Sequence, residues 1–137
     1  LGPEVEEYFA RVAWLRDLVP GELQGKHFQV RTGLAREDIG TPDEDLGQGF
    51  TRAALRLTRT DGPRWSHEVD EHIAAIVAGL NPQGLNLEET IGLYAAAHGF
   101  DEEGLTAAAL PAVIDMVRHG LLIPADLLLD TGSTNLS

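Results

Sequence analysis

The chain has 137 residues, 43% of them hydrophobic, and a net charge of −12, which suits one acidic domain with a core of its own. It has no cysteine, which excludes disulfides and thiolate metal sites, and a reducing, cytoplasmic location is expected. No apolar run approaches the roughly 18 residues of a membrane span, so no membrane partner is expected. Residues 66–137 hold eleven acidic side chains and one basic one, Arg118. Phosphate binding needs several Lys or Arg on one face, so nucleic acid is not an expected partner.

The first predicted element is an amphipathic helix over residues 3–18. Pro3 suits the first helical position, and the acidic residues that follow it stabilise the positive end of the helix dipole. The apolar residues recur at helical spacing and form one stripe: Val5, Tyr8, Phe9, Val12 and Leu15. The turn Val19-Pro20-Gly21 ends the helix.

Two short strands are predicted next, over residues 26–31 and 53–60. The second one alternates, with Leu55 and Leu57 on one face and Arg56 on the other. Residues 33–50 between them are predicted to be loop, because glycine and acidic residues dominate their composition.

Two helices with recognisable starts follow. Ser66 is predicted to cap the first, which has a buried face made of Val69, Ile73, Ile76, Val77 and Leu80. Asn86 with Glu89 three residues later predicts a capping box for the second helix, and Gly99 is its expected end.

A third helix is predicted from Asp101 as its cap to Gly120 as its stop, with a kink at Pro111. Its inner face consists of Leu105, Ala109, Val113, Met116 and Val117. Residues 121–124 then read as a short apolar strand.

This order of elements is that of a winged helix. The predicted fold class is α+β and mostly helical, with a winged-helix-like three-helix core, a small antiparallel sheet and an N-terminal helix. We expect residues 1–50 to be a connector of helix, strand and acidic loop, residues 51–124 to be the winged-helix-like domain, and residues 125–137 to be a tail.

Residues 130–133, Asp-Thr-Gly-Ser, spell the active-site signature of aspartic proteases. Such an enzyme needs two aspartates that share one proton, held in a β-rich frame. The chain has no second copy of the motif, and the sequence before it is helical. A dimer with one motif in each chain stays an alternative, but a polar terminal tail is the preferred interpretation.

Residues 65–72, WSHEVDEH, gather histidine and acidic side chains at the predicted start of a helix. In zinc proteases two histidines stand four residues apart. Here His67 and His72 are five apart, roughly 140° around a helix, so one ion cannot bind both. Two-ligand pairs, His67 with Glu71 or Glu68 with His72, remain open. The preferred interpretation is a solvated helix start, so no metal site is expected.

Other short motifs carry little weight. His98 and His119 each precede a helix-ending glycine, where histidine is a capping preference. Asn81-Pro82 and the Gly-x-Gly of residues 45–50 faintly resemble methyltransferase signatures, but neither has the strand–loop–helix context that such signatures require.

A longer pattern carries a family resemblance. It comprises RTDGPxWxHEVD at residues 59–70, LPAV at residues 110–113 and VRHGLLxP at residues 117–124. Over residues 52–128 the chain resembles the C-terminal domain of actinobacterial class I S-adenosylmethionine-dependent methyltransferases of the HemK-like type. None of that family's cofactor or catalytic motifs falls within this chain.

The resemblance therefore implies a non-catalytic accessory domain, with no cofactor or catalytic residue of its own and with S-adenosylmethionine expected in the parent enzyme. The expected partner is the catalytic domain or a protein or peptide segment. Candidate partner-binding residues are Arg56, Trp65, His67 and Asp70. The alternative is a free-standing peptide-binding winged-helix module, in which an extended segment adds to a sheet edge.

Overall fold

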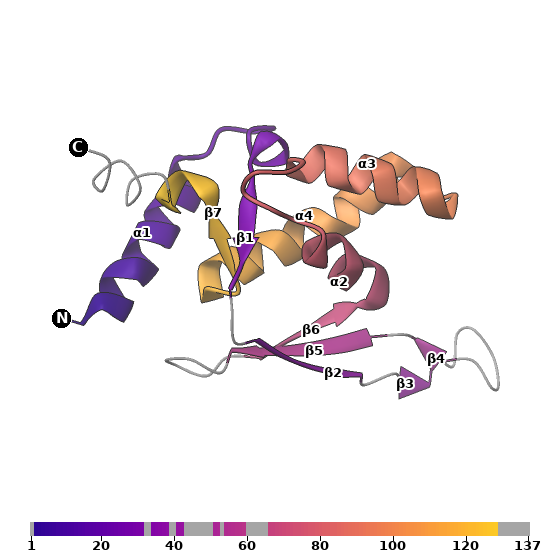
Figure 1. Ribbon diagram of the computed structural model, residues 1–137, viewed down its shortest axis with the longest axis horizontal. Helices are drawn as coiled ribbons and strands as arrows, with labels where there is room; N and C mark the ends of the chain where they lie inside the picture. Colours follow the sequence, from indigo (N-terminus) through magenta and orange to yellow (C-terminus); the bar gives the residue numbers. More distant parts are fainter. Residues whose placement is uncertain are drawn as a thin grey trace.

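The computed structural model describes residues 2–31, 34–38, 41–42, 51–52, 54–59 and 66–128, and side chains for residues 2–31 and 69–128. Four α-helices dominate the described part of the chain (Figure 1): α1 (Pro3–Asp17), α2 (Glu71–Ala78), α3 (Leu87–His98) and α4 (Glu102–His119). A 3-10 turn, η1 (Leu23–Gly25), follows α1, and residues 125–128 form one further helical turn.

The described strands make three small antiparallel sheets. The first sheet joins β1 (Phe28–Val30) to β7 (Leu122–Pro124). The second has the order β2-β5-β6 and the third pairs β3 with β4, with these bounds: β2 (Leu34–Asp38), β3 (Thr41–Pro42), β4 (Thr51–Arg52), β5 (Ala54–Arg59) and β6 (Ser66–Asp70). In Figure 1 the β2-β5-β6 sheet lies to one side of the helices and is joined to them where β6 enters α2.

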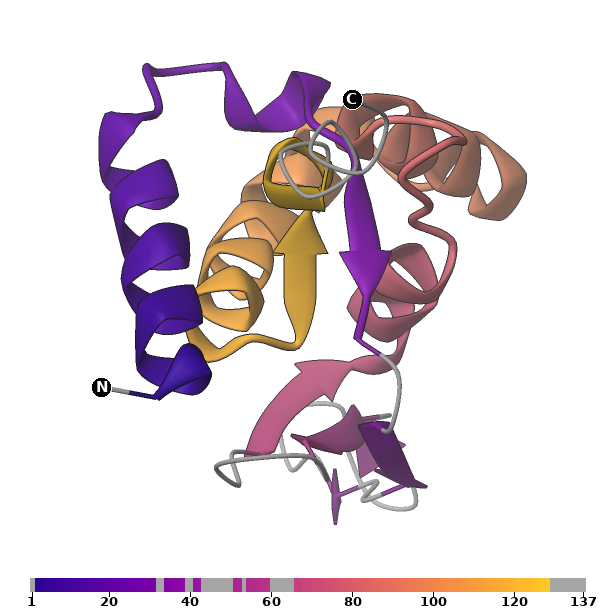
Figure 2. The same cartoon turned by 60° about the vertical axis from the view of Figure 1, so that its left-hand side comes forward.

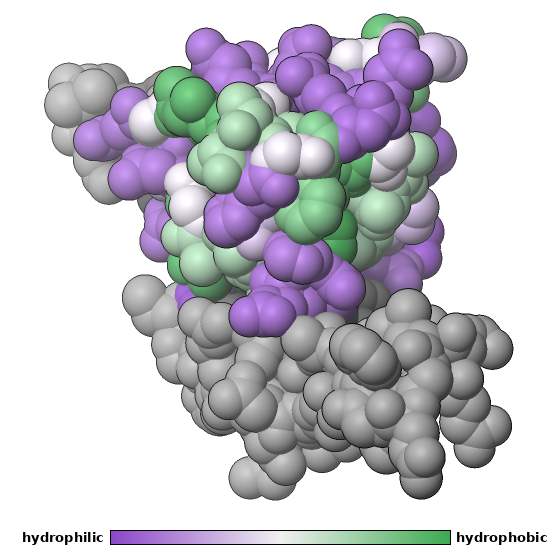
Figure 3. Space-filling model, turned by 90° about the vertical axis from the view of Figure 1, so that its right-hand side faces the viewer, coloured by the Kyte–Doolittle hydropathy of each residue, from purple (hydrophilic) through white to green (hydrophobic). Residues whose placement is uncertain are grey.

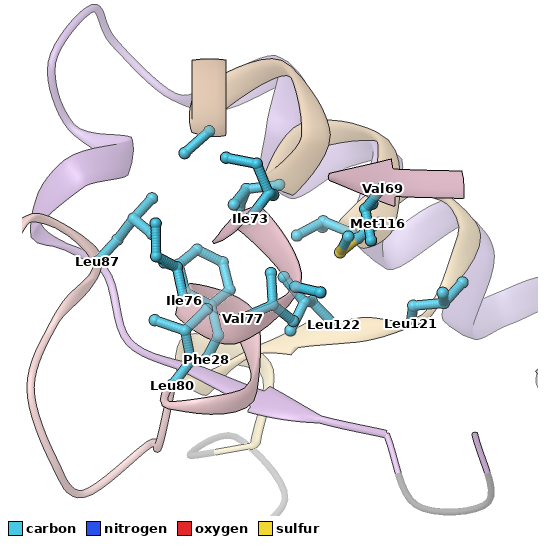
Figure 4. Close-up of a cluster of buried hydrophobic side chains, with 14 of the residues drawn as sticks. Phe28, Val69, Ile73, Ile76, Val77, Leu80, Leu87, Met116, Leu121 and Leu122 are labelled. Carbon is cyan, nitrogen blue, oxygen red and sulfur yellow. The ribbon is translucent and has the colours of Figure 1, made fainter. Parts of the chain in front are cut away.

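The core forms where the β1–β7 pair meets α2 and α4. Phe28 and Leu122 are fully buried together with Val113, Met116 and other apolar side chains. Figure 4 shows Phe28 beside the α2 side chain of Ile76. Two backbone hydrogen bonds of 2.9 Å extend the pair at its ends, from Arg31 N to Leu121 O and from Ala125 N to His27 O.

The predicted helix ends of α3 and α4 are confirmed. Asn86 and Glu89 form the reciprocal capping box of α3, with Asn86 Oδ1 accepting from Glu89 N at 2.8 Å. Asp101 caps α4 by accepting from Gly104 N. Gly99 and Gly120 end the two helices with positive φ angles of 72° and 85°, the left-handed conformation that favours glycine. Pro111 lies within α4, and its predicted kink stays a prediction.

The predicted start of α2 is wrong by one turn. Residues 66–70 are a strand, paired with β5 over the register from Thr58↔Ser66 to Ala54↔Asp70. The cap is therefore Asp70 and not Ser66, and the Asp70 carboxylate accepts from His72 N at 2.7 Å. The helical spacing predicted too early a start for α2, because Val69 is buried in the core from the end of strand β6 and not from a helix.

The prediction that residues 33–50 are loop is wrong for two stretches, because β2 and β3 form there. β2 pairs along its whole length with β5, from Leu34↔Arg59 to Asp38↔Leu55. Local composition gave no sign of this strand, because its partner lies about 20 residues further along the chain. The predicted strands at residues 26–31, 53–60 and 121–124 are confirmed with shorter bounds.

The predicted fold class, α+β and mostly helical with a small antiparallel sheet and an N-terminal helix, is confirmed. The likeness to a winged helix stays a prediction. The core draws on both sides of the predicted boundary at residue 50, since Leu23 and Phe28 pack against α2 and α4. Among the described residues, no helix is long and apolar enough to cross a membrane.

Phe28 is a direct test of this core. We expect Phe28→Ala to lower the free energy of unfolding by about 3–5 kcal/mol, because a buried aromatic side chain leaves a cavity that the neighbours fill only partly. Urea denaturation followed by circular dichroism measures the change. Leu93→Ala is the control, since Leu93 is 62% exposed on α3 and its loss should cost less than about 0.5 kcal/mol. Equal effects of the two changes would contradict the assignment of Phe28 to the core.

Candidate binding surface

Helix α1 buries its apolar stripe only in part: Val12 and Leu15 are half-buried and Leu15 packs against the core, but the start of the stripe is exposed. The side chains of Tyr8 and Phe9 are 42% and 58% exposed, and Val5 is exposed as well. The residue of α1 that is buried is a charged one, Arg11, at 2% exposed. A large exposed apolar patch on a folded domain commonly marks a contact surface.

The opposite side of α1 is attached by charges. Arg11 Nη1 donates to Glu7 Oε1 at 2.7 Å, and the same carboxylate pairs with Arg31, which follows β1. Arg31 Nε also donates to the carbonyl oxygen of Gly120 at the end of α4. These contacts, together with Trp14 and Leu15 packed against the core, fix α1 to the rest of the fold, and Tyr8 and Phe9 at the start of the stripe are left exposed.

A second attachment holds the C-terminal half of α1. Asp126 Oδ2 accepts from Trp14 Nε1 at 2.9 Å and from Lys26 Nζ at 2.8 Å. The Trp14 ring packs edge-to-face on Phe28, with the ring centres 6.0 Å apart. The hydrogen bond from Lys26, followed by the one from Trp14, lowers the pKa of the Asp126 carboxyl below its ordinary value, and the bond to Asp126 raises the pKa of Lys26.

Between α1 and α4 lies a groove of about 590 Å³. Figure 2 shows the two helices that flank it, α1 in indigo and α4 in orange. Its walls are mostly apolar: Val12, Leu15, Leu18, Val19, Pro20, Leu23, Leu110 and Ile114. Volumes of this order are typical of binding pockets. The groove begins one turn after the exposed residues Tyr8 and Phe9, so the stripe and the groove make one apolar surface, which we call the α1 surface.

Two arginines line the α1 surface from opposite walls, Arg16 on α1 and Arg118 on α4. Each is paired with an acidic neighbour on its own helix, Asp17 at 3.3 Å and Asp115 at 3.1 Å. Exposed pairs of this kind contribute little to stability, so both guanidinium groups can exchange these partners for a carboxylate of a bound molecule. The α1 surface therefore fits an apolar segment that carries acidic groups.

A separate cluster of four rings lies where α2 begins and α3 ends. His72 Nδ1 is 2.7 Å from the Tyr94 hydroxyl, and Tyr94 stacks on His98 with ring centres 4.1 Å apart. Phe100 completes this ring cluster, with its ring centre 4.7 Å from that of His72. Burial first, and then the charges of Glu71 and Asp70, raise the pKa of Tyr94.

Comparison with known proteins places this architecture in a family. A family model described as a domain of unknown function, DUF7782, matches residues 6–124. The chain belongs to the DUF7782 family. A catalase-peroxidase of Leptothrix cholodnii is 30% identical over 95 residues, which is 63% of this chain and 13% of that protein. The chain thus spans about an eighth of the length of that relative, and no solved structure matches it.

The DUF7782 match runs from α1 to β7, so it includes both walls of the α1 surface as well as the ring cluster. It also extends across the predicted boundary at residue 50, in agreement with a core built from both parts of the chain.

The four residues predicted to bind a partner are only partly described. Asp70 is exposed and lies beside the ring cluster as the cap of α2. Arg56 lies on β5 and His67 lies on β6. They are not direct partners, because Arg56 pairs with Glu68 and His67 pairs with Leu57. The side chains of Arg56 and His67 are outside the described set. Trp65 lies outside the described residues, as does the Asp-Thr-Gly-Ser motif at residues 130–133.

The predicted angle of roughly 140° between His67 and His72 requires both residues to lie on one helix, but His67 lies on strand β6. Within the described part of the chain, no group of three or more His, Cys, Asp or Glu side chains could hold a metal ion. His98 belongs to the ring cluster, so its position near the end of α3 is more than a capping preference.

Sequence reasoning missed both surfaces for identifiable reasons. The spacing of α1 showed the stripe but not its exposure, because periodicity cannot tell which side of a helix the rest of the fold will cover. The ring cluster was missed because it joins His72 of α2, Tyr94 of α3 and Phe100 after the end of α3, and only the tertiary structure brings these elements together. The spacing of four residues between Tyr94 and His98 was the one local indication.

The Asp126 attachment predicts a pH-dependent contribution to stability. Because folding lowers the pKa of Asp126, its contribution is present above the ordinary value of about 3.8 and is lost as the pH falls through the lower, folded value. We expect Asp126→Asn to unfold at lower urea concentration than the original chain at pH 7. The two urea midpoints should approach each other as the pH is lowered from 7 to 2.5, because the original carboxyl is increasingly protonated over that range.

The control is Asp115→Asn, which changes an exposed carboxylate on α4 that pairs with Arg118. It should shift the midpoint by a smaller amount at pH 7. A gap between Asp126→Asn and the original chain that stays the same at both pH values would contradict a charge-dependent attachment.

Proposed function

We propose that this DUF7782 domain is a non-catalytic accessory domain of an S-adenosylmethionine-dependent methyltransferase, and that it docks onto the catalytic domain or another protein segment through the α1 surface. The methyltransferase part of the proposal rests on the resemblance over residues 52–128. The docking part rests on the geometry of α1 and α4.

The observation that carries the docking function is the exposure of the α1 stripe beside a groove. Tyr8 and Phe9 are 42% and 58% exposed, although a helix of a free domain normally turns such side chains inward. At roughly 25 cal/mol per Å² of apolar surface, covering several large side chains gives a partner a substantial driving force. The α1 surface is therefore suited to a protein contact.

The residues that carry the resemblance support this placement. Leu110 begins the LPAV segment and Arg118 lies within the VRHGLLxP segment, and both line the groove. One wall of the α1 surface is thus formed by the part of the sequence that resembles the methyltransferase family. The other wall comes from α1, which lies outside the resembling segment but within the DUF7782 match.

The alternative, a free-standing peptide-binding module, uses the same surface with a different occupant. The coding sequence upstream of Leu1 distinguishes the two. A glycine-rich loop and an Asn-Pro-Pro-aromatic motif there would support the accessory domain, and the absence of both would support the free-standing module.

Calorimetric titration of S-adenosylmethionine into the 137-residue chain tests the non-catalytic assignment. We expect no heat of binding, because the proposal places the cofactor site in the catalytic domain. One-to-one binding to the isolated chain would overturn the assignment and would place part of a catalytic centre within these residues.

Amide hydrogen exchange tests the docking surface in the longer protein. We expect residues 5–24 to exchange at least tenfold more slowly there than in the isolated chain, because a covering domain excludes water from α1 and the groove. Val19→Asp should reverse that protection without unfolding the domain, since Val19 is exposed. Leu93→Asp, which changes an equally exposed residue on α3, should leave it intact. Equal exchange in the two proteins would contradict docking through α1.

A further inference from the structure

The ring cluster lies apart from the α1 surface and needs a different explanation. In Figure 1, α1 is at the left and the C-terminal end of α3 is at the right. Figure 3 shows the face on that right-hand side, where apolar side chains are interspersed with hydrophilic ones. A role of the ring cluster is independent of the methyltransferase assignment and of docking through α1.

Three of the four rings are close to parallel. The planes of Tyr94 and His98 differ by 26°, those of Tyr94 and Phe100 by 15°, and those of His98 and Phe100 by 18°. His72 stands across them, at 62° to Tyr94 and 70° to Phe100. The hydrogen bond between His72 and the Tyr94 hydroxyl fixes this arrangement. The rings therefore form a platform that is already in place before a ligand binds.

The platform is open to solvent. Phe100 is 41% exposed, and His98 is exposed as well. Phe100 directly follows Gly99, which ends α3 in the left-handed conformation, and its amide donates to Ala95 O at 2.9 Å. A phenylalanine that is held in place by a helix end and is 41% exposed leaves part of its ring accessible at this corner of the domain.

Among the described side chains, the charged groups beside the platform are negative. Glu71 and Asp70 act on Tyr94 from the start of α2, and both carboxylates are exposed. The only basic residue of residues 66–137, Arg118, lines the groove of the α1 surface. Aromatic faces with nearby carboxylates attract cations and repel anions, so this corner of the domain favours a positively charged ligand.

We propose that the ring cluster and the carboxylates of Asp70 and Glu71 bind an organic cation, namely the guanidinium of an arginine side chain or the methylated ammonium of a lysine side chain on a partner peptide. Such cations are weakly hydrated and can leave water to lie against a π face, whereas a compact inorganic ion cannot. The carboxylates supply the counter-charge at the edge of the platform.

The rings and the acids have distinct parts in this binding. Phe100 supplies the exposed π face, and Tyr94 supports it from within the cluster through its ring. The Tyr94 hydroxyl is already occupied by His72, so it orients the platform and is not required to touch the ligand. Asp70 is held by its bond to His72 N, which keeps that carboxylate at the start of α2.

The test is a nuclear magnetic resonance titration of the full 137-residue chain with small probes. The probes are N-acetyl-arginine amide, N-acetyl-trimethyllysine amide and, as the neutral counterpart of arginine, N-acetyl-citrulline amide. We expect at least one of the two cations to shift the ring resonances of His72, Tyr94, His98 and Phe100 saturably, and citrulline to produce no saturable shift. Which cation binds more tightly decides between an arginine and a methylated lysine as the natural ligand group.

Matched variants locate the site. Phe100→Ala should weaken cation binding about two- to fivefold, the measured range for an exposed cation–π contact. Tyr94→Phe keeps the ring but removes the hydrogen bond to His72 that orients the platform, so it should also weaken cation binding, by a smaller factor than Phe100→Ala. Leu93→Ala, an exposed change elsewhere on α3, should have no effect on binding. Far-ultraviolet circular dichroism of each variant verifies that the fold is retained.

Three outcomes would overturn the proposal. Citrulline shifting the same resonances as strongly as arginine would show that charge is not recognised. Saturable shifts confined to the α1 surface would place the cation elsewhere. Unchanged affinity in a folded Phe100→Ala variant would show that the ring cluster serves only to pack α2 against α3.

Discussion

The pairing of β1 with β7 is the constraint on which the rest of the structure depends. It joins Phe28 to Pro124 across almost the whole described chain and places both strands against α2 and α4. Closing so long a loop costs conformational entropy, and the burial of Phe28, Leu122 and Met116 offsets that cost. Because β1 is part of this pair, the segment that carries α1 is fixed to the core and cannot act as a loose connector.

The position of α1 follows from that pairing. Arg31 and Lys26 flank β1, and through Glu7 and Asp126 they bind the polar side of the helix and the turn after β7. Trp14 and Leu15 in the second half of the helix pack against the core as well, whereas Tyr8 and Phe9 in its first half stay exposed. The exposed stripe and the groove beside α4 are thus consequences of how the core is closed, and the proposed docking function uses them directly.

The two surfaces differ in chemistry as well as in place. The α1 surface is apolar, with arginines on both walls, and it suits a segment that carries acidic groups. The ring cluster combines aromatic faces with Asp70 and Glu71, and it suits a cation. Under the two proposals, the domain contacts two different parts of a partner, or two partners at once. Because the two surfaces prefer ligand groups of opposite charge, a partner that contacted both of them would bind in one orientation.

The sequence by itself determined the local features: α1, α3 and α4 with their caps at Asn86 and Asp101, the stops at Gly99 and Gly120, and most of the residues of the core. These features depend on neighbours within a few positions, so periodicity and capping chemistry were sufficient. Only the tertiary structure decided that residues 66–70 are a strand, that β2 forms, and that the start of the α1 stripe stays exposed. It also decided that His72 of α2 meets the rings of Tyr94, His98 and Phe100. Each of these features depends on contacts outside the segment itself, and those contacts outweighed its local preference.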